Sequence, residues 1–377
     1  MGEGFNLVKS FLIEQASRVL HRLLSTEPAA PPNTSESHRI LVVKPASLGD
    51  VLMSTAFLAA LRANLPHADI TVLVTTWAKE ALAGSSHCDH VLDSGSVGFP
   101  GRYGFSAFRD CVSHVREQRF THCFVLDRSP LMALLPRLAG IPWRAGLNSV
   151  HRGIALHIRV PCPDDRHEVE IYLDVLRKAG LDVTRPHLHF CPQSTASSKA
   201  ESLLIDKGLA NGRPIIALHP GGGKNPGTEN IGKRWSRSNF ATLAEGLAGT
   251  LDANILLVGG PDDVPAADSV QSSAGVPVVS VAGKLTFAQL GALIQRCHLF
   301  VGNDSAPMHL AAAVGTSVVA LFGPTSPQRY GPYGVQRKVV RFAPNQGEET
   351  VTDEVEAVLS AARRLLTSSP DNEPVHA

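Results

Sequence analysis

One short stretch near the start of this 377-residue chain, "KPASLGDV" at residues 44–51, places a carboxylate between an apolar run and a helix-like pattern. Gly49 permits a tight turn, and Asp50 falls in the first helical turn, where backbone N–H groups lack partners. An Asp at this position commonly caps the helix. A carboxylate exposed there can also take a proton from a bound hydroxyl. The turn alone favours capping, and the role of general base stays open.

A second stretch, "HPGGGK" at residues 219–224, follows another apolar run and continues to "GKRW" at 232–235. Glycines let a backbone approach an anion closely, and Lys233 and Arg234 add positive charge at the start of the next helix. Lys224 is followed by Asn225, so this is not a Walker A loop. The pattern indicates a phosphate-binding loop, with a solvated glycine loop as the alternative.

Two further stretches also come at the ends of apolar runs. In "GNDSAPMH", residues 302–309, Asp304 or Ser305 can cap a helix that Pro307 opens. The N–H groups of that helix could hold a pyrophosphate, and the small Ser305 and Ala306 favour ligand contact over an ordinary capped helix. In "VGGPDD", residues 258–263, Asp262 or Asp263 could bind ribose hydroxyls or simply cap.

Composition and missing motifs narrow the function. Lys and Arg number 35 against 34 Asp and Glu, which does not fit a nucleic-acid-binding protein. A Gly-x-Gly-x-x-Gly after the first strand is absent, which disfavours a nicotinamide oxidoreductase, and so are a Gly-x-Ser-x-Gly elbow and an Asp-x-Asp metal motif. The segment 87–90, "HCDH", has no second ligand pair at a zinc spacing. We expect no metal site and no cofactor.

The apolar pattern alternates strands and helices in two series, which predicts parallel sheets covered by helices. Expected strands are 39–44, 70–74 and 121–127, then 214–218, 253–258, 298–301 and 317–322. Expected helices are 51–65 and 168–178, then 240–247, 287–295, 307–314 and 353–366, and amphipathic sequence at 105–115 lies between strands of the first series. The chain therefore reads as two Rossmann-like domains, 39–185 and 196–345, followed by a C-terminal helix over 351–367.

The ends of the chain lie outside this alternation. Residues 1–25 carry apolar residues at helical spacing, and 26–38 form a Pro/Ser-rich linker that we do not expect to pack. The helix over 5–24 either docks on protein or lies in a membrane interface. Its charged residues interrupt any signal peptide, and no apolar run is long enough to span a bilayer, so we expect a cytoplasmic protein. Residues 368–377 are expected to be a disordered tail.

Taken in order, the four stretches resemble glycosyltransferase family 9, the ADP-heptose:lipopolysaccharide heptosyltransferases. The resemblance rests on "KPASLGDVLMSTAFLAALRANLPHADITVLV", "LHPGGG" with "GKRWSRSNFATLAEGL", "LLVGGPDD" and "LFVGNDSAPMHLAAAVGTSVVALFGPTSPQRYGPYG". It spans roughly residues 39–345 and implies the GT-B fold, in which two Rossmann-like doubly wound domains face each other across a cleft. The first domain would bind the acceptor and the second the nucleotide-sugar donor.

The resemblance also implies roles for individual residues. The family's general base falls on Asp50, its phosphate-binding lysine on Lys233, and its donor-sugar and pyrophosphate turn on Asp304, Ser305 and Ala306. The acidic ribose contact falls on Asp262 or Asp263. The adenine-facing segment falls on 282–285, including Leu285, and the glycine loop contributes Gly222 and Gly223.

The implied reaction is an inverting, metal-independent transfer of heptose from ADP-heptose to a lipopolysaccharide-core type of glycolipid. Arg128 and Arg144 of the first domain are the expected acceptor contacts, and 5–24 the membrane contact on the cytoplasmic side. The sequence departs from common members at Gly221–Gly223 and in the insertion 225–231. Another nucleotide-sugar, used for a surface polysaccharide or a protein, is therefore the main alternative, and a non-catalytic nucleotide-sugar-binding protein is the second.

Overall fold

The computed structural model describes residues 30–33, 37–99, 101–184, 186–226, 228–343 and 351–367. The expected N-terminal helix, residues 26–29 and 34–36 of the linker, and the C-terminal tail lie outside these residues. The chain divides into two compact units. The first takes the described residues up to 79 together with 86–186, and the second takes 80–85 and the described residues from 187 onward.

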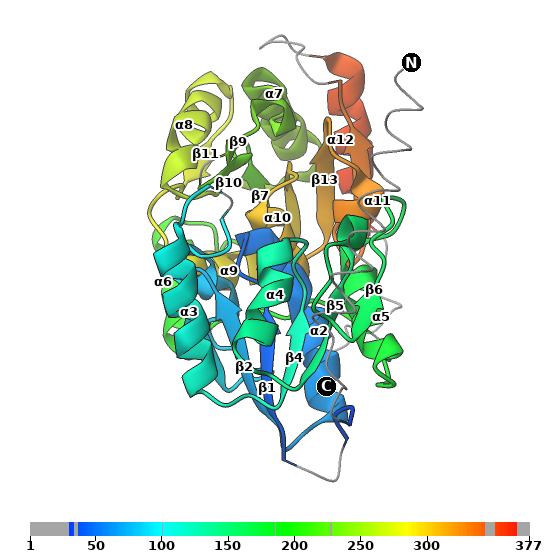
Figure 1. Cartoon of the computed structure of the whole chain (residues 1–377). Coiled ribbons are helices and arrows are strands. Elements are labelled where there is room, and N and C mark those ends of the chain that lie inside the picture. Colours follow the sequence, from blue (N-terminus) through cyan, green and yellow to red (C-terminus); the bar gives the residue numbers. More distant parts are fainter. Residues whose placement is uncertain are drawn as a thin grey trace, which may run out of the picture. The chain divides into compact units, whose positions relative to one another are not determined.

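The first unit is built on a six-stranded, fully parallel sheet with the strand order β3-β2-β1-β4-β5-β6 (Figure 1). The strands are β1 (Arg39–Val43), β2 (Asp69–Val74), β3 (His90–Asp93), β4 (His122–Val125), β5 (Trp143–Leu147) and β6 (Ile158–Val160). This is the strand order of Rossmann-type domains. The order changes direction between β1 and β4, and we call this point the switch point of the first unit.

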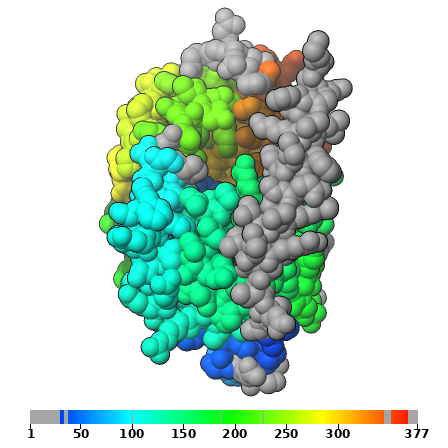
Figure 2. All heavy atoms as spheres, viewed as in Figure 1, coloured from blue at the N-terminus to red at the C-terminus, as the bar shows by residue number. Residues whose placement is uncertain are grey.

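Helices cover both faces of the first sheet, as the continuous apolar sequence of β1 requires. On one face, α3 (Phe105–Glu117) and α4 (Pro130–Leu138) share an apolar core with strand residues such as Val43 and Val125. In Figure 2 the atoms of these two helices, coloured cyan to green, lie on the face of this unit that is turned to the viewer. On the other face, α2 (Leu48–Asn64) packs with α5 (Glu168–Lys178), and Phe57 of α2 meets Phe124 edge to face at 5.3 Å.

The second unit repeats this arrangement with the strand order β11-β10-β7-β12-β13-β14, again fully parallel. The strands are β7 (Ile215–His219), β10 (Asn254–Leu257), β11 (Val278–Ser280), β12 (Leu299–Asn303), β13 (Val318–Phe322) and β14 (Arg337–Arg341). Its switch point lies between β7 and β12. A short hairpin of β8 (Lys224–Asn225) and β9 (Thr228–Glu229) follows the glycine-rich loop.

Two helical layers also enclose the second sheet (Figure 1). An apolar core joins one face to α7 (Arg237–Leu251), α8 (Val264–Ser273) and α12 (Thr352–Thr367). On the other face α9 (Phe287–Gln295) packs against α6 (Ser194–Asp206) and α10 (Ala306–Ala313). Short helical turns complete the described chain: η1 (Thr76–Leu82), η2 (Ser149–His151), η3 (Ile231–Lys233), η4 (Pro261–Asp263) and α11 (Pro327–Tyr330).

The described part of the linker does pack, contrary to our expectation. The Ala30 carbonyl lies 3.1 Å from Nε2 of His122 at the start of β4, and the backbone of Asn33 hydrogen-bonds the imidazole of His38. Pro32 is buried. These contacts satisfy polar groups at the amino ends of the strands, so residues 30–33 belong to the first unit.

The two sheets of parallel strands confirm the doubly wound α/β fold expected from the alternating pattern. In such sheets, ligands bind outside the carboxyl ends of the strands at the switch point. The stretches 44–50 and 126–128 follow β1 and β4, and the stretches 219–223 and 304–306 follow β7 and β12. Within the described residues, no helix is both long and apolar enough to cross a membrane.

Candidate functional site

Asp50 lies at the switch point of the first unit, in the first turn of α2. Its Oδ2 accepts hydrogen bonds from the backbone N–H of Ser47, at 3.0 Å, and from the Ser47 hydroxyl, at 3.2 Å. The Lys44 ammonium lies 3.9 Å from the same oxygen, and the Asp50 side chain remains 31% exposed. The carboxylate therefore caps the turn and also presents surface to solvent, so the two roles left open by the sequence are compatible.

Asp127 follows β4, beside the turn that holds Asp50. Its Oδ1 accepts a hydrogen bond from the backbone N–H of Ser129 at 2.8 Å. Burial and the nearby Asp50 carboxylate raise the pKa of Asp127, whereas the Lys44 ammonium lowers it. The net result is a raised pKa. The first unit therefore gathers two carboxylates and an ammonium at its switch point.

The two arginines expected to contact an acceptor lie in different environments. Arg128 makes a two-pronged pair with Glu168 at the start of α5, with N–O distances of 2.7 and 3.3 Å. Arg144, in contrast, is only 2% exposed, and its guanidinium donates to the backbone carbonyls of Ile141 and Ala155. Burial lowers the pKa of Arg144 to about 10. Because those donors are used inside the unit, the structure argues against an acceptor contact by Arg144.

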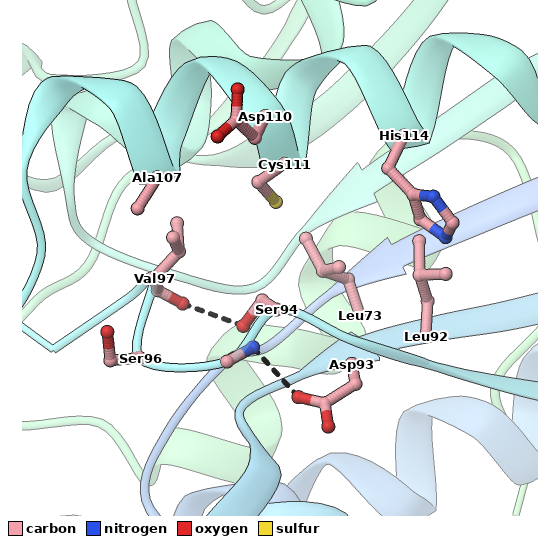
Figure 3. Close-up of a pocket in the computed structure, with 11 residues that line it drawn as sticks. Leu73, Leu92, Asp93, Ser94, Ser96, Val97, Ala107, Asp110, Cys111 and His114 are labelled. Carbon is pink, nitrogen blue, oxygen red and sulfur yellow. Dashed lines mark hydrogen bonds between the residues drawn. The ribbon is translucent and has the colours of Figure 1, made fainter.

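A separate pocket of about 380 Å³ lies in the first unit, between the turn after β3 and one face of α3 (Figure 3). Apolar side chains form much of its wall, with Asp93, Asp110 and His114 among its polar members. Asp93 is already paired with Lys79 at 2.7 Å. Burial raises the pKa of the Cys111 thiol to about 11, so the thiol stays protonated near neutral pH. No motif in the sequence indicated this pocket.

At the switch point of the second unit, Lys233 and Asp304 form a partly buried ion pair. The Lys233 ammonium lies 2.7 Å from Oδ2 of Asp304, whose side chain is 5% exposed. The Thr325 hydroxyl donates to the same oxygen at 2.7 Å. Ser305 and Ala306 follow directly and begin α10. A cation and the N-terminus of a helix thus lie together, an arrangement that suits a bound anion.

A buried histidine connects the loops around this ion pair. His219, at the end of β7, is fully buried, with Nε2 3.1 Å from Oδ2 of Asp263 and Nδ1 3.1 Å from the Ser305 hydroxyl. Asp263 also accepts hydrogen bonds from the backbone N–H groups of Gly222, at 2.8 Å, and Gly260, at 2.9 Å. These contacts tie the glycine-rich loop, the loop after β10 and the start of α10 to one another.

The contacts of Asp263 distinguish between the two expected ribose ligands. Burial raises the pKa of Asp263, but His219 and the two backbone N–H groups outweigh burial and hold it well below the usual value. Both carboxylate oxygens are engaged within the unit, which indicates a structural role. Asp262 is exposed and pairs with Lys224 at 2.5 Å. Of the two, Asp262 is the better placed for an outside ligand.

The glycine-rich loop is too tightly packed for side chains. Gly222 has φ +97°, and a Cβ there would lie 2.8 Å from the Cβ of Ser305. Gly223 has φ +75°, and a Cβ there would lie 2.4 Å from the carbonyl oxygen of Asn230. The loop therefore requires glycine for its conformation and for its close approach to α10 and to the segment after the hairpin.

Trp235 anchors the segment that carries Lys233. Its indole N–H donates to Glu354 of α12 at 2.7 Å, and its backbone N–H donates to the side chain of Asn303 at 3.1 Å. The neighbouring Arg234 donates from Nε to the Gly222 carbonyl at 2.8 Å. Helix α12 thus fixes the position of Lys233 indirectly.

The structure brings together most of the expected donor-site residues and separates others. Gly222, Lys233, Asp304, Ser305 and Ala306 converge at one switch point. Leu285 follows β11, two strands away in the sheet, and is half-buried.

Sequence reasoning missed several residues that hold these sites in place. They are Lys44, Asp127, Glu168, Tyr172, His219, Thr325 and Glu354. A signal was present for three of them, because Lys44, Asp127 and His219 lie at or just after the ends of buried strands. Only their neighbours in the sequence were predicted from that position. For Tyr172 and Glu354, whose partners are far away in the sequence, we find no local signal.

Comparison with known proteins shows the family of the chain. A model of glycosyltransferase family 9 (heptosyltransferase) matches residues 109–358, a range that begins after Asp50. The chain is 30% identical over 321 residues to lipopolysaccharide heptosyltransferase 2 of Salmonella typhimurium, covering 81% of this chain and 88% of that protein. It is likewise 30% identical over 319 residues to lipooligosaccharide heptosyltransferase 2 of Haemophilus influenzae, covering 80% and 88%.

Solved structures extend the comparison to the fold. A family 9 glycosyltransferase from Veillonella parvula aligns with a TM-score of 0.76 at 23% identity, covering 90% of this chain and 99% of that one. The Escherichia coli ADP-heptose lipopolysaccharide heptosyltransferase II aligns with a TM-score of 0.68 at 26% identity, covering 87% and 98%. These structural relatives confirm the expected GT-B class. The chain belongs to glycosyltransferase family 9, the heptosyltransferase family.

Proposed function

We propose that this glycosyltransferase moves a heptose from ADP-heptose to a lipopolysaccharide-core type of glycolipid, with inversion at the anomeric carbon. The observation that carries the proposal is the Lys233–Asp304 pair at the start of α10, on the switch point of a Rossmann-type unit. The names of the relatives at 26–30% identity supply the sugar and the acceptor class.

The donor diphosphate would bind to the second unit. Lys233 contributes its ammonium, which Asp304 holds in place, and the N-terminal N–H groups of α10, beginning at Ser305 and Ala306, contribute the positive end of a helix dipole. Gly222 and Gly223 leave the backbone uncovered beside them. The leaving nucleoside diphosphate gains negative charge as its bond to the sugar breaks, and these groups stabilise that charge. We infer that no divalent metal is needed, because a lysine ammonium and a helix N-terminus can together stabilise the leaving diphosphate.

Asp50 would act as the general base. In the proposed step the acceptor hydroxyl oxygen forms a bond to the anomeric carbon, its proton passes to Asp50, and the carbon–oxygen bond to the diphosphate breaks with both electrons leaving on ADP. Attack opposite to the leaving group inverts the configuration, through a state with oxocarbenium character.

Acceptor and membrane contacts complete the proposal. Arg128, at the carboxyl end of β4, is the candidate contact for an anionic acceptor. Asp262 is the candidate ribose contact, and Leu285 the candidate adenine contact. We further propose a cytoplasmic enzyme whose residues 5–24 contact the membrane that holds the glycolipid. Deletion of 5–24 should move the protein out of the membrane fraction, and an unchanged distribution would contradict that contact.

A second candidate within the same class is transfer of a different nucleotide-activated sugar. The observation in its favour is the β8–β9 hairpin, which the insertion adds beside the glycine-rich loop. The backbone N–H of Asn230 donates to the Gly223 carbonyl at 2.7 Å, so the insertion is bonded directly to the proposed phosphate loop.

Donor profiling with the purified protein tests the assignment. ADP at a hundred times its dissociation constant should stabilise the folded state by about 2.7 kcal/mol, while UDP, GDP and NAD at equal concentration should have smaller effects. ADP-heptose and a heptose-free core glycolipid should then yield a heptosylated product. Preference for UDP or GDP would favour the second candidate, and preference for NAD would overturn the class.

A further inference from the structure

Lys44 is a buried charged residue that the proposed reaction does not use. It follows β1, and its side chain is only 7% exposed. Its ammonium lies 3.9 Å from Oδ2 of Asp50 and 5.6 Å from the centre of the Tyr172 ring, on α5. A buried ammonium costs free energy unless opposite charge or a π-face compensates it, so its neighbours are informative.

Asp127 places a second carboxylate just after the neighbouring strand β4. The backbone N–H of Leu126 donates to the Val43 carbonyl at 2.9 Å, so Asp127 and Lys44 leave adjacent strands at the same level of the sheet. Burial raises the pKa of Asp127, and of the neighbouring charges Lys44 lowers it most and Asp50 raises it. One ammonium therefore interacts with two carboxylates that come from the two strands of the switch point.

Two further charged residues near this group, Arg128 and Glu168, are paired with each other. Arg128 and Glu168 neutralise each other through their two-pronged pair. Burial and Glu168 raise the pKa of the Tyr172 hydroxyl well above its usual value, so it stays neutral. Of the charges described here, Lys44 favours the ionised form of Asp50, and the Asp127 carboxylate opposes it.

We propose that Lys44 is a positioning residue that holds Asp50 ionised and oriented, and that Asp127 is the opposing charge that adjusts how strongly Asp50 binds a proton. The functional consequence rests on the proposed role of Asp50 as the base. Lys44 alone would make Asp50 a weak proton acceptor, and Asp127 alone would leave it protonated at higher pH. The two neighbours together keep Asp50 ionised without removing its basicity.

Because Lys44 and Asp127 act on Asp50 in opposite directions, replacing each of them should shift the titration of Asp50 in opposite directions. In the full-length protein labelled with ¹³C at the aspartate side-chain carboxyls, Asp50 can be titrated by NMR, with Asp50→Asn used to assign its signal. We expect Lys44→Met to raise the pH midpoint of Asp50 by about one unit or more, and Asp127→Asn to lower it. Lys44→Arg keeps the charge and should stay near the wild-type midpoint.

Matched controls separate electrostatics from damage to the fold. Lys79→Met breaks another lysine–aspartate pair of the same unit and should leave the Asp50 midpoint unchanged. If Lys44→Met does not fold, Lys44→Gln replaces it, and Asp127→Asn still tests the opposite sign. Midpoints that do not move, or that move in the same direction in both variants, overturn the inference.

Activity then separates this inference from the proposed function. If Asp50 is the base, the acidic limb of the pH profile of kcat/KM should shift upward in Lys44→Met and downward in Asp127→Asn. NMR midpoints that move while the activity profile stays fixed would support the charge arrangement and contradict the role of Asp50 as base. NMR midpoints that stay fixed would contradict the arrangement whatever the activity.

Discussion

At the scale of single residues, the sites depend on charges that are already paired before any ligand binds. Lys233 is held by Asp304, and Asp304 in turn by Thr325. Such pairing fixes the ammonium in place, so less ordering is needed when an anion arrives.

Replacement of Lys233 should therefore affect both binding and stability. Lys233→Met should weaken ADP binding by about tenfold or more, since a charge-assisted hydrogen bond contributes about 1.5–3 kcal/mol. It should also lower the melting temperature, because Asp304 is left buried without its cation. Calorimetric titration and thermal unfolding measure the two effects. Lys224→Met, at an exposed pair, is the control and should leave stability nearly unchanged.

Asp263 should give the stability of the protein a recognisable pH dependence. Its folded-state pKa lies below its unfolded value, so its contribution is fully present above about pH 4 and is lost as pH falls towards the folded pKa. Asp263→Asn should cost about 1–3 kcal/mol at pH 7, because an amide has one acceptor oxygen and cannot replace the contacts with His219, Gly222 and Gly260 together. Urea unfolding of the wild-type protein and the variant should show that the difference in their free energies of unfolding becomes smaller below pH 4. A gap independent of pH would contradict the pairing.

The residues found from the sequence and those missed differ in a physical way. Asp50, Lys233, Asp304 and Ser305 lie in short stretches of small and charged residues, which are visible locally. His219 acts through partners 44 and 86 residues away, on other strands and loops. Contacts between different strands and loops form only when the sheet assembles, so the partners of His219 could not be predicted from the sequence.

At the scale of elements, buried strands could be predicted from the sequence and exposed strands could not. Strands enclosed on both faces, such as β1 and β13, are continuous apolar runs and were predicted within one or two residues. The edge strands β3 and β14 are mostly exposed and lack that signal. Helix α4 was missed because Pro136 lies inside it. Helices α5 and α9 begin and end as predicted.

The tight loop between β7 and the hairpin should tolerate no side chain. Gly222→Ala should reduce ADP affinity and lower the melting temperature, because its Cβ would press on Ser305 at a positive φ. Gly249→Ala, in α7, has open space around its Cβ and should stabilise the protein by about 0.5–1 kcal/mol. Equal behaviour of the two variants in thermal unfolding and ADP titration would contradict the packing argument.

Helix α12 should influence the donor site through Trp235. Glu354→Gln weakens a charge-assisted hydrogen bond to the indole, and we expect a loss of about 1–2 kcal/mol of stability and a higher KM for the donor. Urea unfolding and steady-state kinetics measure these effects. A variant that loses stability while its donor KM is unchanged would show that α12 supports the fold and not the site.

At the scale of the whole molecule, two units of one architecture divide the proposed chemistry. Each unit has the same strand order and places its charged residues at its own switch point. The first supplies a carboxylate with opposing neighbours, and the second supplies a cation beside a helix N-terminus. The sequence was sufficient to predict both architectures, because alternating strands and helices leave few alternatives.

The most direct test of the central claim compares heptose transfer by the wild-type protein with transfer by Asp50→Asn, using ADP-heptose and a core glycolipid. The substitution keeps the shape of the side chain and removes its basicity, while Asp110→Asn, at an exposed carboxylate of the same unit, serves as the control. We predict that kcat falls by about 10²–10⁴-fold in Asp50→Asn, while the variant still folds and binds ADP. Turnover near the wild-type rate in that variant would contradict the account.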